Sequence, residues 1–367
     1  MTDHLKWTCD VLVIGAGPAG STAARFAAEK GVSVILLERR DKVGLPVRCA
    51  EFVPLPVSRY VDLSSPALLA QPIRSMRTFI PGEAVQESPL QGAMIRRDRL
   101  DQELALLAVR AGVRLETGFQ ALTHENGRVT ARGKMGPVRI AARIVIGADG
   151  PSSRVAGWLG IPRGEFLAAA QVRVPLKVPL DHTRIYFRPQ FIGGYGWLFP
   201  KGKEANVGLG LAHSYKGELM PALRRLKQEL KTEGIIGEPI LGKMGGLIPV
   251  GGLTQVWKGK MILAGDAAGT CHPISGAGVA NALLSGEMAG EAAAGAVQGN
   301  QEAPLRNYEK DLIGLLGRSL GQAAQKRKAL MAAWHKRDFA ENIRQNWIAF
   351  KEYYHQDCSR ADHGQGN

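Results

Sequence analysis

A glycine-rich turn near the N-terminus constrains the fold of this chain more than any other feature. Residues 15–20 have the sequence GAGPAG and directly follow an apolar, β-branched run at 9–14. Residues 21–30 have helical character, and a second apolar run at 32–37 ends at Glu38. Strand, turn, helix and strand in this order predict a βαβ unit, which in turn requires a parallel sheet.

The turn has the GxGxxG pattern of dinucleotide-binding sites. The first glycine permits the tight turn, the second lets the backbone approach a pyrophosphate, and the third lets the helix pack close to the strand. Free N–H groups at the helix N-terminus bind phosphates, and the acidic residue after the second strand accepts ribose hydroxyls. The predicted cofactor-binding residues here are Gly15, Gly17, Ala19, Gly20, Glu38 and Arg39.

The rest of the chain alternates between irregular, sheet-like and helical patterns. Residues 41–89 are proline-rich and are predicted to be irregular, whereas short strands and turns at 171–211 predict an antiparallel sheet. Residues 305–354 are predicted to be mostly helical. We therefore expect a dinucleotide-binding domain at 1–165 and 245–300, with part of the substrate region inserted near 50–95, a substrate domain at 166–244 and a helical region at 301–367.

Two downstream segments distinguish FAD from NAD. Residues 144–154 are IVIGADGPSSR, and residues 260–281 are KMILAGDAAGTCHPISGAGVAN. They resemble the DGxxSxxR and GDA…PxxGxG motifs of glutathione-reductase-like flavoproteins, in particular the p-hydroxybenzoate hydroxylase group. The resemblance implies an α/β fold in which a glutathione-reductase-like FAD-binding Rossmann domain is interleaved with an antiparallel-sheet substrate domain. It also implies FAD contacts at Arg97, Asp149, Gly150, Arg154, Asp266, Pro273, Gly276 and Gly278.

A finer resemblance connects residues 9–300 with the geranylgeranyl reductase family. The segment YGWLFPKG at 195–202 is similar to that family's YxWxFP motif. PVRCAE at 46–51 stands where the family has a cysteine, although Ala50 replaces the glycine that often follows it. The resemblance implies reduction of isoprenoid carbon–carbon double bonds by hydride from reduced flavin. The electron donor it implies is NAD(P)H or reduced ferredoxin.

Such a reduction needs a proton at one alkene carbon while hydride reaches the other. Cys49 is the predicted catalytic residue, either as proton donor or as a modulator of the flavin environment; an inert buried thiol is the alternative. Glu51 is a weaker candidate for the proton donor. His272 lies in the second flavin motif, but we expect its ring to form hydrogen bonds with backbone groups and not to approach the flavin. The substrate pocket is predicted at three aromatic residues that alternate along a strand and so share one face, unless they are ordinary core aromatics: Tyr195, Trp197 and Phe199.

Three other functions compete with this hypothesis. The main alternative is an FAD-dependent monooxygenase of an aromatic or prenyl substrate, since the FAD motifs are shared. A flavin halogenase fits less well. Halogenases have the motif WxWxIP, whereas this chain has Tyr195 in place of the first tryptophan and Phe199 in place of the isoleucine. A carrier that retains FAD structurally would not need the full set of flavin contacts.

Charge and composition limit the partners. The net charge is +14, but the charged residues form no long run of one sign, so we expect no nucleic-acid partner. The sequence contains no CxxC pair, so we expect no metal site. No apolar run reaches about 20 residues, and we expect a cytoplasmic protein with peripheral membrane contact to reach a prenyl-lipid substrate. The apolar face of the C-terminal region either docks on a bilayer or packs on the FAD-binding domain. The basic and apolar residues of this region are Lys326, Arg327, Lys328, Lys336, Arg337, Leu330, Met331, Trp334, Phe339 and Trp347.

Overall fold

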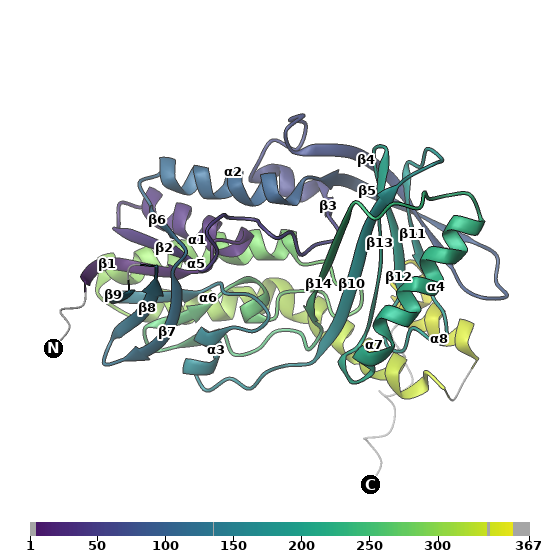
Figure 1. Cartoon of the computed structure of the whole chain (residues 1–367). Coiled ribbons are helices and arrows are strands. Elements are labelled where there is room, and N and C mark those ends of the chain that lie inside the picture. Colours follow the sequence, from purple (N-terminus) through teal and green to yellow (C-terminus); the bar gives the residue numbers. More distant parts are fainter. Residues whose placement is uncertain (1–4, 135, 336–337, 355–367) are drawn as a thin grey trace, which may run out of the picture.

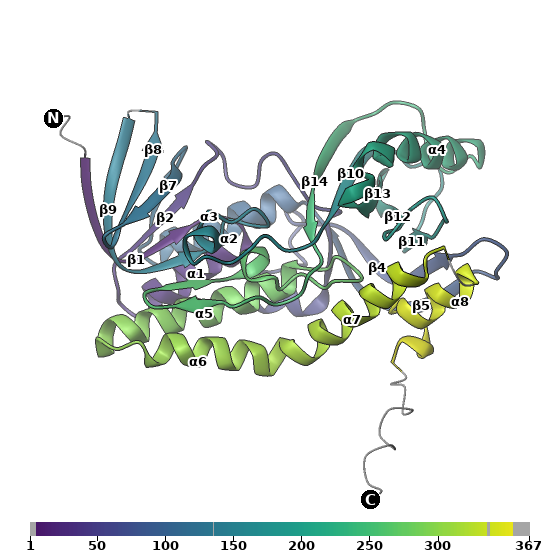
Figure 2. The ribbon, with the colours of Figure 1, turned by 90° about the horizontal axis from the view of Figure 1, so that it is seen from below.

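The computed structural model describes residues 5–134, 136–335 and 338–354. The chain forms two lobes that lie side by side, each built around its own sheet (Figure 1). Helices that follow the last strand of the first lobe run along both lobes and end beside the second (Figure 2). The cavity described below lies where the two lobes meet.

The first sheet is built on the predicted βαβ unit. It consists of β1 (Leu5–Ile14), α1 (Pro18–Glu29) and β2 (Val34–Glu38), with the two strands parallel. The strand order is β15-β16-β9-β1-β2-β6, and the hairpin β7–β8 extends from β9. The other strands are β6 (Arg114–Thr117), β7 (Gln120–Glu125), β8 (Arg128–Gly133), β9 (Gly136–Gly147), β15 (Trp257–Lys258) and β16 (Met261–Leu263).

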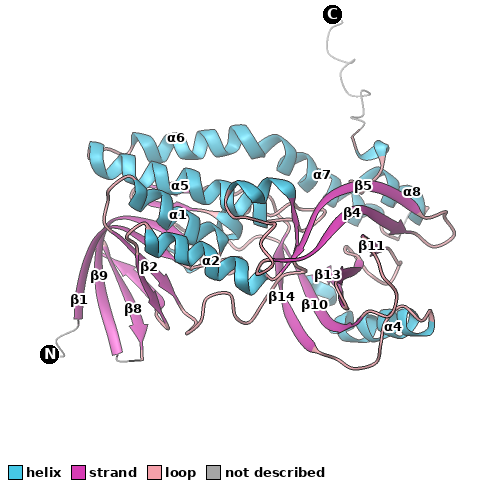
Figure 3. Cartoon of the chain, turned by 90° about the horizontal axis from the view of Figure 1, so that it is seen from above, coloured by secondary structure: helices cyan, strands magenta, loops and turns pink. Residues whose placement is uncertain are grey.

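Helices cover one face of this sheet (Figure 3). They include α2 (Arg97–Arg110), α5 (Val279–Gly299) and α6 (Ala303–Leu312), while the short α3 (Arg154–Trp158) follows β9. The small residues of α5 let it approach α1 closely. A Cβ at Gly286 or Gly290 would meet the backbone oxygen of Ala19 or Ala23. This contact fixes α1, and therefore the glycine turn before it, against the core.

The second sheet has the order β14-β10-β13-β12-β11-β4-β5-β3. Adjacent strands in this sheet are antiparallel, as predicted, except for the parallel pair β4–β11. The amphipathic helix α4 (Leu219–Thr232) packs its buried leucines on this sheet. The strands are β3 (Phe52–Pro54), β4 (Leu69–Phe79), β5 (Gln86–Ile95), β10 (Phe166–Pro175), β11 (His182–Tyr186), β12 (Gly196–Lys201), β13 (Glu204–Ala212) and β14 (Gly242–Pro249).

The prediction that residues 41–89 are irregular was wrong. This segment contains β3, β4 and the start of β5. Proline weakens a strand pattern because it cannot donate to the ladder, and it is tolerated next to bulges. Pro72 and Pro89 lie beside the register shifts that interrupt the β4–β5 pairing, so the two strands persist despite them.

The C-terminal region is mostly helical, as predicted, with α7 (Arg318–Ala333) and α8 (Phe339–Asn346) after a π-helical turn. The apolar face of α7 packs on the second sheet: Leu330 and Trp334 belong to a core cluster with residues of β4 and β11. Arg327 is only 5% exposed. Of the two alternatives for this helix, packing on its own protein is therefore the one observed. The helix packs mainly on the second sheet, and it also meets Ile274 in the loop before α5. Lys336 and Arg337 lie outside the described residues.

No helix in the described ranges combines the length and the apolar character needed to cross a bilayer.

Candidate functional site

A cavity of about 510 Å³ lies between the two lobes, and both sheets contribute to its wall. Most of the residues predicted from sequence line it. Gly20 and Pro273 do not, and the Pro273 ring faces the loop at Gly252 instead. The predicted residues in the wall are Gly15, Gly17, Ala19, Glu38, Arg39, Cys49, Arg97, Asp149, Gly150, Arg154, Tyr195, Trp197, Phe199, Asp266, Gly276 and Gly278.

The glycine turn forms one end of this cavity. Gly15 has φ +103°, and a Cβ there would meet the backbone oxygen of Ala148. Gly17 is the N-cap of α1, and a Cβ at Gly17 would have no neighbour within 4 Å. A Cβ at Gly20 would meet the backbone oxygen of Gly15, so this glycine serves close packing. The turn therefore leaves an open, backbone-lined space at a helix N-terminus, which suits a phosphate group.

The Glu38 carboxylate is held at the edge of this space by two backbone groups. The N–H of Ala16 donates to Oε2 at 3.0 Å, and the N–H of Arg40 donates to Oε1 at 3.0 Å. A carboxylate has about four lone-pair positions, so two remain to accept further donors. The Glu38 carboxylate is therefore fixed in place and can still accept hydrogen bonds from ribose hydroxyls.

Asp149 lines the cavity, but its oxygens hold the loop that begins α3. It accepts from Ser153 Oγ at 2.5 Å and from the N–H of Arg154 at 2.6 Å. Burial raises the pKa of Asp149 above its ordinary value, against these hydrogen bonds. The carboxylate therefore shapes the loop, and the exposed Arg154 at the end of this loop borders the cavity.

A buried charged group lies deeper in the wall. Arg97 Nε donates to Asp101 Oδ1 at 2.7 Å, and both side chains are largely buried. The guanidinium of Arg97 also lies close to the side chain of Cys49. Burial raises the pKa of Asp266, and the positive charge of Arg97 acts in the opposite direction. Arg97 thus supplies positive charge next to both the thiol and a second carboxylate.

His272, in the loop before α5, has backbone partners. Its Nδ1 accepts from the N–H groups of Ile274 and Ser275 at 3.3 and 3.2 Å, so the ring proton is on Nε2. Burial lowers the pKa of His272 from 6.5 to about 4. The ring is neutral at pH 7 and supports the loop, in agreement with the interpretation favoured by the sequence.

This histidine makes a testable contribution to stability. Between pH 6.5 and 4, His272 is protonated in the unfolded chain but stays neutral in the folded protein. The free energy of unfolding therefore falls as the pH drops through this range. His272→Asn keeps an acceptor for the two N–H groups but cannot titrate. We expect the loss in free energy of unfolding between pH 6.5 and 4 to be about 1–3 kcal/mol smaller in this variant than in the parent. Urea unfolding at several pH values measures the effect, with the exposed His213→Asn as control; identical pH slopes for the two variants would contradict it.

The three predicted aromatic residues form a continuous wall. Successive ring centroids from Tyr195 to Trp197 and from Trp197 to Phe199 are 6.1 and 6.4 Å apart. Tyr195 donates from its hydroxyl to the backbone oxygen of Ser275 at 2.5 Å, and burial raises the pKa of this tyrosine. Trp197 Nε1 donates to Gln171 Oε1 at 2.8 Å. All three rings line the cavity, so they share one face, as the strand alternation predicts.

Cys49 is held in the wall from both sides. Its backbone N–H donates to Met244 Sδ at 3.2 Å, and its Sγ accepts from the N–H of Glu51 at 3.2 Å. The neighbouring residue Cys271 is buried, and burial raises the pKa of its thiol well above the ordinary value. Of the two thiols in the wall, Cys49 is the more accessible and the one that lies beside a positive charge.

Glu51 is not available as a free acid. Its carboxylate oxygens accept from the backbone N–H of Arg97, from Lys201 Nζ and from Asn206 Nδ2. Its φ of +73° is rare for a residue with a side chain and costs about 1–3 kcal/mol, so the surrounding contacts must hold it. Sequence motifs did not point to Lys201 or Asn206, because nothing local shows that β12 and β13 meet this loop.

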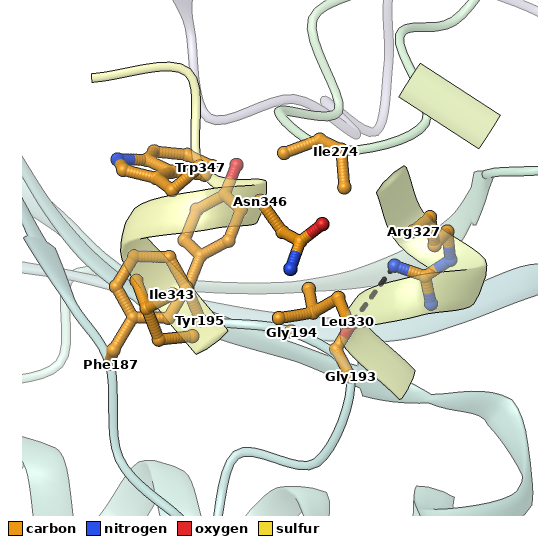
Figure 4. A pocket seen from close by; sticks show the side chains of 10 residues that line it. All are labelled: Phe187, Gly193, Gly194, Tyr195, Ile274, Arg327, Leu330, Ile343, Asn346 and Trp347. Carbon is orange, nitrogen blue, oxygen red and sulfur yellow. Dashed lines mark hydrogen bonds between the residues drawn. The ribbon is translucent and has the colours of Figure 1, made fainter. Parts of the chain in front are cut away.

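The C-terminal region supplies two wall residues that the sequence did not indicate, Trp347 and Ile348. The Trp347 ring lies 5.0 Å from Tyr195, centroid to centroid. These two rings also border a second cavity of about 10 Å³, room for roughly one water. In this small cavity, Arg327 Nη1 donates to the backbone oxygen of Gly193 at 2.9 Å (Figure 4). Such a contact between distant segments leaves no local sequence signal.

Comparisons with known proteins agree with this geometry. Residues 13–72 match the NAD(P)-binding Rossmann-like domain family. The chain is 35% identical to a digeranylgeranylglycerophospholipid reductase of Methanocella arvoryzae, with 86% of each covered. It is 36% identical to the protein of that name from Methanothrix thermoacetophila, covering 86% of this chain and 85% of the relative.

Solved structures share the overall fold of this chain. A geranylgeranyl bacteriochlorophyll reductase-like protein of Thermoplasma acidophilum superimposes with a TM-score of 0.81 at 28% identity, covering 93% of this chain and 97% of that one. A flavin-dependent brominase superimposes with a TM-score of 0.71 at 17% identity over 93% of this chain and 90% of its own, which shows the shared fold alone. The chain belongs to the geranylgeranyl reductase family of FAD-dependent oxidoreductases.

Proposed function

We propose that this protein binds FAD in the cavity between its lobes and reduces carbon–carbon double bonds of an isoprenoid lipid chain. One observation supports this most directly: a single cavity joins a phosphate-binding glycine turn to an aromatic wall and a thiol. Relatives with 35–36% identity are named for the reduction of a digeranylgeranylglycerophospholipid. A prenyl lipid is therefore the substrate class we infer.

The residues present fit FAD in several independent ways. Gly17 leaves space at the N-terminus of α1 where any side chain would project into the cavity. Glu38 has lone pairs available for ribose hydroxyls. Gly278 is the N-cap of α5, so the backbone N–H groups that follow it suit the flavin edge that becomes negative on reduction. We infer that Asp266, next to Gly278, contacts the ribityl chain or a neighbouring phosphate.

The protein side of the chemistry follows from the wall residues. A bound reduced flavin supplies the hydride. Tyr195, Trp197 and Phe199 exclude water from the alkene and orient it, which keeps a developing positive charge from reacting with solvent. Sγ of Cys49 holds the proton for the other alkene carbon. The guanidinium of Arg97 lies beside this thiol and supplies positive charge to this part of the wall.

Mass spectrometry of lipids after incubation with dithionite-reduced protein tests this function. Each saturated double bond adds two hydrogen atoms, and an unsaturated prenyl lipid should gain them stepwise. No mass gain across prenyl lipids, free diphosphates and quinones would reject the proposal. Oxygen consumption coupled to insertion of an oxygen atom would instead support the monooxygenase alternative. Replacing dithionite with NAD(P)H or reduced ferredoxin identifies the electron donor.

Asp266→Ala should weaken FAD binding. A hydrogen bond to a charged group contributes about 1.5–3 kcal/mol, which corresponds to roughly a 10- to 150-fold rise in the Kd of FAD. Fluorescence titration of the apoprotein measures this Kd. Asp311→Ala, an exposed carboxylate on α6, is the matched control. Equal FAD affinity in both variants would remove Asp266 from the binding site.

Access to a bilayer lipid also requires contact with its surface, which we propose to be electrostatic. The net charge of +14 attracts anionic headgroups by about 1 kcal/mol per well-placed cation. The buried face of α7 does not contribute. We expect flotation with anionic vesicles at low salt, none with neutral vesicles, and release at about 0.5 M salt, where the screening length becomes short. Absence of flotation at low salt would favour delivery of the substrate by a carrier.

A further inference from the structure

A buried polar network surrounds Glu51 in the cavity wall. Its side chain is buried, with 4% of the residue exposed. Oε1 accepts from the backbone N–H of Arg97 at 3.0 Å, while Oε2 accepts from Lys201 Nζ at 2.7 Å and from Asn206 Nδ2 at 2.9 Å. Lys201 is the last residue of β12, the strand that carries Trp197 and Phe199. The ion pair therefore connects the loop that carries Cys49 with the strand that forms the aromatic wall.

We propose that Glu51 and Lys201 are positioning residues for Cys49. Their buried ion pair fixes the loop at residues 46–51 to the β12–β13 hairpin and so fixes Sγ of Cys49 relative to the aromatic wall. The inference rests on the proposed function, because it assigns a task to the residue proposed as proton donor.

Contacts on three sides transmit this constraint to the thiol. The N–H of Glu51 donates to Cys49 Sγ at 3.2 Å, and the N–H of Cys49 donates to Met244 Sδ at 3.2 Å. Between them, the backbone oxygen of Ala50 accepts from Asn206 Nδ2 at 3.1 Å. A shift of Glu51 therefore shifts the thiol. Proton transfer to an alkene depends steeply on such placement, since an error of about 1 Å can lower a rate roughly 100-fold.

A structural role and a positioning role predict different results. Removing one partner of a buried ion pair leaves an unpaired charge and destabilises the protein, whereas neutralising both partners is often tolerated. The informative variant is therefore the double variant Glu51→Gln/Lys201→Met. It nearly keeps the size of both side chains and keeps the acceptor for the Arg97 N–H, but it loses the ion pair and the acceptor for Asn206 Nδ2.

The experiment uses the full-length, FAD-loaded protein. Peptide mass spectrometry follows alkylation of each cysteine by iodoacetamide, with Cys9 on β1 as internal control. The double variant should change the alkylation rate of Cys49 at least about fivefold and lower kcat about 10- to 100-fold, with KM and FAD content nearly unchanged. Lys201→Arg keeps the charge and should retain kcat within about threefold of the parent.

An exposed ion pair on the same sheet supplies the matched control. Arg173 Nε and Glu204 Oε2 are 3.1 Å apart on β10 and β13, and neither residue lines the cavity. Arg173→Met/Glu204→Gln should leave kcat and Cys49 alkylation unchanged. The proposal is overturned if the Glu51/Lys201 double variant keeps both values, or if the control alters them equally. If the parent protein reduces no isoprenoid, the proposed function fails, whereas the alkylation result still decides whether this pair positions Cys49.

Discussion

Replacement of Gly17 by valine is expected to give a folded but colourless protein. A Cβ at this position meets no protein atom within 4 Å, and the residue lines the cavity at the N-terminus of α1. A branched side chain would therefore be accepted by the fold while occupying the space of the pyrophosphate. Losing two charge-assisted hydrogen bonds costs at least about 3 kcal/mol, so FAD should bind more than 100-fold more weakly.

The ratio of flavin absorbance to protein absorbance after purification measures the loss. Gly164→Val is the control, because Gly164 is exposed, has equal free space and does not line the cavity. Gly15→Val is less informative, since the φ of +103° and the contact with Ala148 would strain the fold as well. Full FAD content in the Gly17 variant would show that the cofactor does not bind at this turn.

Cys49→Ser should retain FAD and lose most of the alkene-reduction rate. Serine preserves the size of the side chain, but its hydroxyl is a far weaker acid than a thiol. Proton transfer by a positioned group contributes about 100- to 10,000-fold, and the rate should fall within that range. Single-turnover reduction of a prenyl lipid by dithionite-reduced protein measures the chemical step without dependence on the electron donor.

Two controls separate chemistry from packing in this variant. Its melting temperature and FAD content should match those of the parent, and Cys9→Ser, on β1 and outside the cavity wall, should react normally. A Cys49→Ser rate within about twofold of the parent corresponds to less than about 0.5 kcal/mol of barrier. In that case Cys49 would be a packing residue, and the proton would come from another group or from water.

The sequence by itself determined the features that depend on short-range geometry. The glycine turn, its flanking strand and helix, and the acidic residue at the end of β2 form one continuous stretch of chain, so their roles follow from local spacing. The common face of Tyr195, Trp197 and Phe199 follows from the alternation of side chains along a strand. The loop before α5 was likewise identified from a contiguous motif.

The tertiary structure alone decided which distant surfaces meet. Residues 46–51 contain no signal that Glu51 pairs with Lys201, 150 positions away, and not with a substrate. The pattern of α7 indicated an amphipathic helix, but only the fold shows that the second sheet covers its apolar face. Trp347 likewise reaches the cavity because α8 places it against Tyr195. Local patterns record which face of an element avoids water, whereas the surface that covers this face depends on the packing of the whole chain.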